Sequence, residues 1–206
     1  MKLHKRGGTL KQHFLNSSLN FILASDKNIT EEKKEKLLYG LEGLYLTITK
    51  LIIINIIALV LGIWQEFIIS LILFNILRFP GFGFHANNSF TCLLTSTIII
   101  VGMPFLLIHI TIPTIGKAIL ADLAVLPFII YAPADTVKRP LTNKRKRIIR
   151  KIVASILAII YAIIIILLPN DKISSLFLSG LLIETIFILP ITYKIFKTPY
   201  ANYKKI

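Results

Sequence analysis

The run KRKRIIRKIVASILAIIYAIIIILLP at residues 144–169 decides the class of this protein, because cationic residues lead directly into a long apolar series. From Ile148 to Leu168 the chain is almost unbroken Ile, Leu and Ala, and about twenty such residues suffice for a helix to cross a bilayer. Lys and Arg gathered at one end of such a segment are typical of its cytoplasmic end. The stretch therefore predicts a transmembrane helix whose basic end faces the cytoplasm.

The composition of the whole chain agrees with this interpretation. Its 206 residues are 55% hydrophobic, and 24 Lys+Arg against 10 Asp+Glu give a formal net charge of +14. The mean hydropathy is +0.75, which excludes an intrinsically disordered chain. Because the basic residues are confined to a few segments, a membrane protein is favoured and a nucleic-acid partner is not expected.

Six apolar runs follow one another along the sequence, and they predict an all-α, polytopic membrane protein with about six transmembrane helices. The second run is short and is followed by Pro80, so two interpretations stay open for the second and third runs: two full spans, or a re-entrant pair. The runs are Leu41–Gly62, Trp64–Leu77, Thr91–Ile110, Pro113–Ala132, Ile148–Leu168 and Ser174–Tyr193.

The distribution of basic residues predicts the orientation of these spans. Residues 1–40 and the loop 133–151 carry eight Lys or Arg each, and the tail 194–206 carries four. By the positive-inside rule, all three segments lie in the cytoplasm. Residues 1–40 and 194–206 flank a transmembrane domain over residues 41–193, and the basic loop 133–151 belongs to that domain. The sequence therefore predicts a multi-pass membrane protein with both termini cytoplasmic.

The N-terminal segment contains a candidate amphipathic helix. Apolar side chains recur at helical spacing over Thr9–Ser25 among polar ones, which favours a helix lying on the surface of the lipid bilayer. A helix packed against other cytoplasmic residues is the alternative.

Cys92 is the only cysteine of the chain, which excludes an intrachain disulfide and a site built from several cysteines. The four histidines are scattered along the sequence, so we expect no metal and no cofactor. Cys92 is therefore either a small buried side chain or a nucleophile.

The segment RFPGFGFHANNSFTC at residues 78–92 holds the best candidate for chemistry. His85 precedes Cys92 by seven residues, a spacing that puts both on one face of a straight helix but about 10 Å apart. The glycines and Pro80 favour a turn before a new helix, which would bring the two side chains closer. A histidine beside a cysteine can take the thiol proton and later protonate a leaving amine, while a purely structural role for either residue is the alternative.

These residues resemble the accessory gene regulator B (AgrB) family of membrane cysteine endopeptidases. The matching pattern is R-x4-G-x-H-A-x5-C, formed here by Arg78, Gly83, His85-Ala86 and Cys92. The segment YAPADT at residues 131–136, followed by Lys138-Arg139-Pro140, is similar to the loop that the family carries after its fourth apolar run.

The resemblance implies a peptidase that processes an AgrD-type propeptide of quorum-sensing signals. Cys92 and His85 are then the catalytic residues, with Arg78 and Gly83 in supporting roles. Cleavage would leave an acyl-enzyme thioester on Cys92, and attack by a cysteine or serine of the propeptide would release a thiolactone or lactone. The resemblance also suggests a homodimer.

The basic loop has two possible uses. Topology and contact with anionic lipid are sufficient reasons for its charge. Because the propeptides of the family tend to have acidic C-terminal tails, the loop is also a candidate for substrate binding. The candidate residues are Lys138, Arg139, Lys144, Arg145, Lys146 and Arg147.

Acidic residues inside predicted spans are costly and therefore informative. Asp122 and Glu184 are candidates for a third catalytic group, but both fall away from the predicted cytoplasmic boundary. We expect them to form structural pairs, for example with Lys50 or Lys117, and we expect a dyad without an acid. Two alternative classes of protein stay open: a small transporter that uses Asp122, Glu184 and Lys50, and a membrane scaffold without activity.

Overall fold

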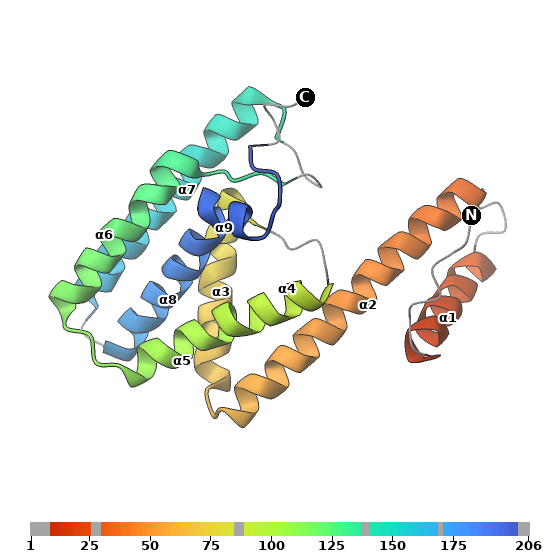
Figure 1. Cartoon of the computed structure of the whole chain (residues 1–206), viewed down its shortest axis with the longest axis horizontal. Helices are drawn as coiled ribbons and strands as arrows, with labels where there is room; N and C mark the ends of the chain where they lie inside the picture. The colour runs from red at the N-terminus through yellow and green to blue at the C-terminus, as the bar shows by residue number, and fades with distance from the viewer. Residues whose placement is uncertain (1–8, 26–29, 85–88, 137–140, 169–170, 202–206) are drawn as a thin grey trace. The chain divides into compact units, whose positions relative to one another are not determined.

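The computed structural model describes residues 9–25, 30–84, 89–136, 141–168 and 171–201. These residues form an all-helical structure, as the sequence predicts (Figure 1). The chain divides into two compact units, residues 1–56 and 57–206, which are described separately. The helices in order are α1 (Thr9–Ser25), α2 (Glu31–Val60), α3 (Trp64–Gly81), α4 (Ser89–Ser96), the π-helix η1 (Thr97–Val101), α5 (Gly102–His109), α6 (Thr114–Tyr131), α7 (Lys144–Leu167), α8 (Asp171–Ile188) and α9 (Pro190–Ile195).

The unit of residues 1–56 contains α1 and most of α2. The bounds of α1 are those of the helix expected at Thr9–Ser25, while its position on a membrane surface stays a prediction. Lys11 of α1 forms an ion pair with Glu42 of α2, and the rings of Phe14 and Tyr45 lie 5.4 Å apart. An ion pair and an aromatic contact therefore join the two helices.

Four helical segments are long and apolar enough to cross a membrane, so the chain is a membrane protein by length and composition: Glu31–Val60, Phe90–His109, Thr114–Tyr131 and Lys144–Leu167. They correspond to the first, third, fourth and fifth predicted spans. Helices α3 and α8 lie where the second and sixth spans are predicted, but charged residues such as Arg78 and Glu184 make them less apolar. The count of six spans and the re-entrant alternative thus stay predictions.

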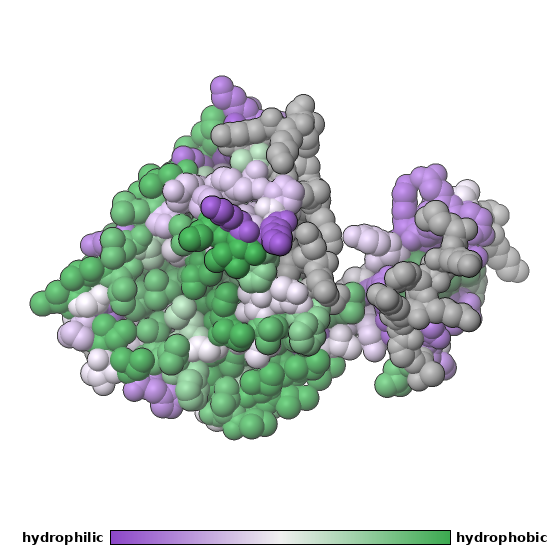
Figure 2. All heavy atoms as spheres, in the orientation of Figure 1, coloured by the Kyte–Doolittle hydropathy of each residue, from purple (hydrophilic) through white to green (hydrophobic). Residues whose placement is uncertain are grey.

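Apolar side chains also cover the outside of the 57–206 unit. Figure 2 shows this face of the unit mostly in green, with hydrophilic residues at its edges and in a patch on its upper part. Ile and Leu residues of α6 and α7 are exposed along these helices, among them Ile119, Leu126, Ile156 and Ile163. An apolar exterior of this kind suits lipid rather than water as the surrounding medium.

Helix α8 is the central element of the 57–206 unit, where it packs against α3, α5, α6 and α7 (Figure 1). Small residues explain how it packs so closely. A Cβ atom added to Gly180 would lie only 3.0 Å from Leu73 Cβ and 3.1 Å from Phe74 N, so α3 and α8 meet almost backbone to backbone. Packing between membrane helices depends on such small residues, because lipid gives no hydrophobic drive for helices to associate.

Buried polar contacts supplement this packing. The hydroxyls of Ser70 and Ser179 are 2.7 Å apart and join α3 to α8, and the Tyr161 hydroxyl of α7 donates to Leu73 O at 3.0 Å. The Thr185 hydroxyl of α8 makes a contact of 3.1 Å with Ala124 O of α6. Buried hydroxyls thus find hydrogen-bond partners on neighbouring helices, and that of Thr185 also donates to Leu181 O of its own helix at 2.8 Å.

Two ion pairs hold the first turn of α8. Lys117 of α6, only 2% exposed, donates to Asp171 Oδ1 at 2.5 Å and to Asp171 O at 2.9 Å. Lys172 Nζ lies 2.5 Å from Glu66 Oε1 at the start of α3. Neighbouring residues of α8 therefore tie its N-terminal end to two different helices.

The third apolar run is not a uniform α-helix. Between α4 and α5, the five residues of η1 adopt a π-helix, and the N–H of Gly102 donates to both Ile98 O and Ile99 O. Both η1 and α5 pack on α3, and α5 also packs on α8, while α4 packs on η1. The segment before η1 is thus joined to the bundle through a change in helical winding.

We expect Asp171→Ala to destabilise the protein more than Lys117→Met. The first change leaves a buried ammonium group with only one carbonyl as a partner, whereas the second keeps the aliphatic stem and leaves an exposed carboxylate. We expect a loss of about 2–3 kcal/mol for Asp171→Ala, below the value typical of a fully buried pair, and less than about 1 kcal/mol for Lys117→Met. Unfolding of the purified protein in detergent micelles measures both, and equal losses would contradict this account.

Candidate active site

The candidate site begins where α3 ends, in a turn at residues 78–84 whose geometry depends on glycine. Phe82 has φ 60° and Gly83 has φ 119°, so the chain leaves the helix sharply. A Cβ atom on Gly83 would lie 2.6 Å from Arg78 Nη1 and 3.0 Å from Phe187 O. Any side chain at Gly83 would therefore displace either the arginine or the backbone of α8.

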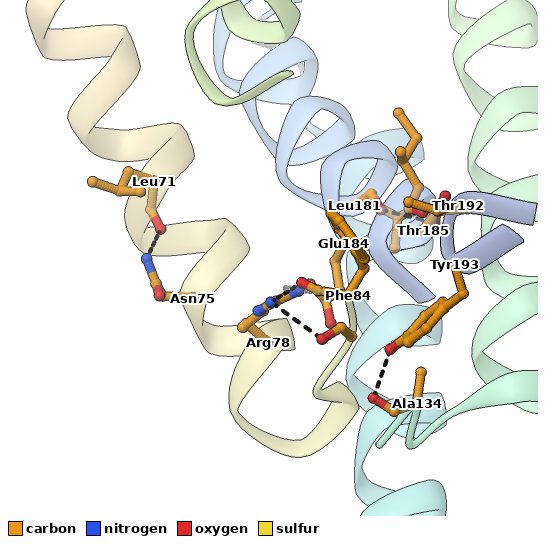
Figure 3. A network of polar contacts seen from close by, with 12 residues as sticks. Leu71, Asn75, Arg78, Phe84, Ala134, Leu181, Glu184, Thr185, Thr192 and Tyr193 are labelled. Carbon is orange, nitrogen blue, oxygen red and sulfur yellow. Dashed lines mark hydrogen bonds and ion pairs between the residues drawn. The ribbon is translucent and has the colours of Figure 1, made fainter. Parts of the chain in front are cut away.

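Arg78 holds this turn from inside. Its Nη2 donates to Phe84 O at 2.7 Å and to Gly83 O at 3.4 Å, as Figure 3 shows for Phe84. Its Nη1 lies 3.4 Å from Glu184 Oε2 of α8. The guanidinium also lies over the rings of Phe74 and Phe187, at 5.6 and 5.0 Å from their centres. The charge of Arg78 is thus surrounded by carbonyls, a carboxylate and aromatic faces.

The turn contacts the other segment that the sequence singles out, YAPADT at residues 131–136. The N–H of Gly83 donates to Ala134 O at 2.8 Å, and the N–H of Ala134 donates to Gly81 O at 2.9 Å. These bonds form an isolated parallel bridge between Phe82 and Ala134. Two sequence motifs some fifty residues apart are therefore paired through their backbones.

Further contacts fix both segments to the C-terminal helices. The Tyr193 hydroxyl of α9 donates to Ala134 O at 3.0 Å (Figure 3), and the N–H of Phe84 donates to Phe187 O at 2.7 Å. The Phe84 ring stacks on Phe196 with 4.5 Å between centres. Neither Tyr193 nor Phe196 stands out in the sequence, because an aromatic residue in an apolar segment is ordinary there.

Arg150 of α7 is a second cation at this turn. Its Nη1 donates to Phe79 O at 2.8 Å, and its guanidinium lies over the Phe82 ring at 4.6 Å. From the sequence, Arg150 counts only as part of the basic loop. In the structure it connects the start of α7 to the backbone of the turn.

Glu184 lies elsewhere than the sequence predicts. The predicted span Ser174–Tyr193 places it near the middle, but α8 ends at Ile188 because Pro190 begins the separate helix α9. Glu184 therefore lies in the last turns of α8, level with Arg78. The expected pairing of Glu184 with Lys50 or Lys117 is wrong, because Glu184 pairs with Arg78.

Lys117, Asp122 and Asp135 have other partners or surroundings than Glu184. Lys117 pairs with Asp171, so its expected pairing with Asp122 is wrong as well. Asp122 is exposed on α6. Asp135 is fully buried, and its Oδ2 accepts a hydrogen bond from the N–H of Leu141 at 3.4 Å. The structure thus brings Glu184, and neither Asp122 nor Lys117, to the turn.

Cys92 lies in the second turn of α4 and is partly exposed. His85 lies outside the described residues, so the pairing of His85 with Cys92 stays a prediction. What the structure does describe is Phe84, the residue directly before His85, and it is held by Arg78 and by Phe187 O.

Of the basic candidates for substrate binding, the structure describes some and not others. Lys138 and Arg139 lie outside the described residues. Lys144, Arg145, Lys146 and Arg147 form the first turn of α7, where the Asn143 side chain accepts from the N–H of Lys146. Cations at a helix N-terminus oppose the helix dipole, so helix stability does not explain their presence. A small cavity of about 130 Å³ lies beside the start of α7 and is lined by Arg147, Lys151, Asp135 and Tyr200, among others.

Among the residues that the structure describes, no group of three or more His, Cys, Asp or Glu side chains is placed to hold a metal ion. The expectation that no metal takes part stays a prediction.

Comparison with known proteins gives the family. The family model described as Accessory gene regulator B matches residues 16–188. An AgrB-like protein of Listeria innocua is 35% identical over 179 residues, covering 85% of this chain and 86% of the relative. An AgrB-like protein of Clostridium acetobutylicum is 31% identical over 82% of this chain and 80% of its own length. Protein FsrB of Enterococcus faecalis is 29% identical over 84% of this chain and 72% of its own length.

No solved structure matches this chain. The family model spans the turn at residues 78–84, Cys92, the 131–136 segment and Glu184, whereas Tyr193 and Phe196 lie beyond the matched region. The chain belongs to the accessory gene regulator B family.

Proposed function

We propose that this protein is a multi-pass cysteine endopeptidase of the bacterial cell membrane that cleaves an AgrD-type quorum-sensing propeptide. The observation that carries the proposal is the fixed turn at residues 78–84. It holds the chain immediately before His85, and Cys92 follows on the next helix. Membership of the family supports the substrate class.

The chemistry needs only the two predicted catalytic residues. His85 takes the proton of the Cys92 thiol, and the thiolate attacks a peptide carbonyl carbon of the propeptide. The C–N bond then breaks, His85 returns the proton to the leaving amine, and the N-terminal part stays on Cys92 as a thioester. A thiol of the propeptide then attacks the carbonyl carbon of this thioester, and the C–S bond to Cys92 breaks. The products are a thiolactone and free Cys92. One thioester replaces another, so the exchange is close to neutral in free energy.

The charges of the described helices do not favour a transporter. A midplane pathway would need acidic and basic residues facing one passage between the helices. Here Glu184 is buried against Arg78, whereas Asp122 is exposed on the outside of α6. The two carboxylates thus face different surroundings. A homodimer and a contact of the basic segment with lipid remain predictions.

We expect Cys92→Ala to lower the rate of propeptide cleavage by about a thousandfold or more, because the nucleophile is lost. Thr95→Ala, one turn further along α4, is the matched control and is expected to keep cleavage near the native rate. Mass spectrometry of a co-expressed propeptide measures both. Full processing by the Cys92→Ala protein would refute the peptidase proposal.

We expect the double variant Lys144→Gln, Arg145→Gln to raise KM about fivefold at low ionic strength while kcat stays unchanged, since these exposed cations would attract an acidic tail. The difference from the native protein should disappear at high salt, where such attraction is screened. An unchanged KM at low salt would show that these two residues do not bind substrate.

The orientation can be tested by labelling single cysteines in a Cys92→Ser background. Thr111 and Thr142 are both exposed, and they lie before α6 and before α7, at opposite ends of the predicted fourth span. We expect a membrane-impermeant maleimide to label Thr111→Cys in intact cells and Thr142→Cys only after permeabilisation. The reverse pattern would overturn the predicted topology.

A further inference from the structure

We propose that Glu184 is a positioning residue of this peptidase, acting through Arg78 on the backbone that leads to His85. This inference rests on the proposed function, because it assigns a role in the same site. Glu184 takes no part in the cysteine chemistry described above, yet its carboxylate is completely buried.

A chain of contacts joins Glu184 to the turn at residues 78–84. Glu184 Oε2 lies 3.4 Å from Arg78 Nη1, while Arg78 Nη2 reaches Phe84 O at 2.7 Å and Gly83 O at 3.4 Å. One guanidinium therefore connects a carboxylate of α8 to the carbonyls of the last two residues before His85. Figure 3 shows the Arg78 side chain pointing toward Glu184 and Phe84.

The turn fits closely around this ion pair. A Cβ atom on Gly81 would lie 2.8 Å from Glu184 Oε1, and one on Gly83 would lie 2.6 Å from Arg78 Nη1. Each charged group of the pair therefore occupies space that a glycine leaves open. The two glycines and the two charges form one closely fitted unit.

Burial of the Glu184 carboxylate costs free energy of folding. Glu184 Oε1 is buried and accepts no hydrogen bond from any described residue. An unsatisfied buried acceptor lowers stability, and a buried ion pair is often no more stabilising than apolar residues of similar size. Stability alone therefore gives a poor reason for a carboxylate here, whereas the orientation of Arg78 gives a direct one.

The consequence for the site follows from electrostatics. Without the carboxylate, the guanidinium would lie among Phe74, Phe187 and backbone carbonyls without a counter-charge. A cation in such surroundings turns toward water or a headgroup, and the carbonyls of Gly83 and Phe84 then lose their donor. The backbone of Gly83 and Phe84, which directly precedes His85 in the chain, would then lose the contacts that hold it.

The test compares Glu184→Gln with the native full-length protein in detergent micelles. The variant keeps the size of the side chain and removes its charge. We expect kcat for propeptide cleavage to fall about tenfold or more, with KM within about twofold of the native value. The alkylation rate of Cys92 by iodoacetamide should also fall about tenfold, toward the rate of His85→Ala.

Thr185→Val is the matched control. Thr185 is the next residue of α8 and is also buried, and its hydroxyl contacts α6 rather than the turn. We expect it to lower stability while leaving kcat and the alkylation rate unchanged. Partial unfolding would expose Cys92 and raise its alkylation, so a fall in alkylation separates lost positioning from lost fold.

Gly81→Ala provides a second route if Glu184→Gln does not accumulate. It keeps both charges and pushes the carboxylate away from its position, so the same fall in kcat and in alkylation is expected. If either variant alkylates and cleaves as the Thr185→Val protein does, the positioning role is refuted. Because alkylation needs no propeptide, that result stays distinct from failure of the peptidase proposal, which the Cys92→Ala variant decides.

Discussion

The structure of the site depends on the placement of one cation, Arg78, at the end of a helix with largely apolar surroundings. A guanidinium cannot lose its proton in a protein, so every N–H donor that is taken from water needs an acceptor. Here the acceptors are the Glu184 carboxylate and the carbonyls of Gly83 and Phe84. The turn and the end of α8 are consequently arranged around the same charge.

This arrangement explains why α8 is both central and unusually polar. The helix must approach α3 closely enough for Glu184 to reach Arg78, and Gly180 and Ser179 allow that approach. At its other end, Asp171 and Lys172 bind α6 and α3. Ionic contacts at both ends, with small residues between them, fix the helix along its length as well as around its axis. Apolar contacts alone would specify its position less strictly.

The sequence predicts the parts of this structure that depend on local pattern. Apolar runs predict the all-helical class and the four helices that are long and apolar enough to cross a membrane, and Pro80 with the glycines that follow it predicts the turn. The pairing of Glu184 with Arg78 was missed, because it depends on where α8 ends. Pro190 signals that end, but a Pro within an apolar run does not say whether a helix bends or stops. The bridge between Phe82 and Ala134 depends on tertiary packing and carries no local signal at all.

The π-helix η1 separates α4, the helix that carries Cys92, from α5, the helix that packs on α8. Such a segment holds one residue more than the α-helix it replaces, and one residue corresponds to about 100° of rotation. A shift of the π-turn along the chain, or deletion of a single residue within Thr97–Val101, would rotate α4 while α5 keeps its packing on α8. Within a family that diverges in sequence, this offers a route by which the direction of the helix that carries Cys92 can change through the deletion of a single codon, without any repacking of the core.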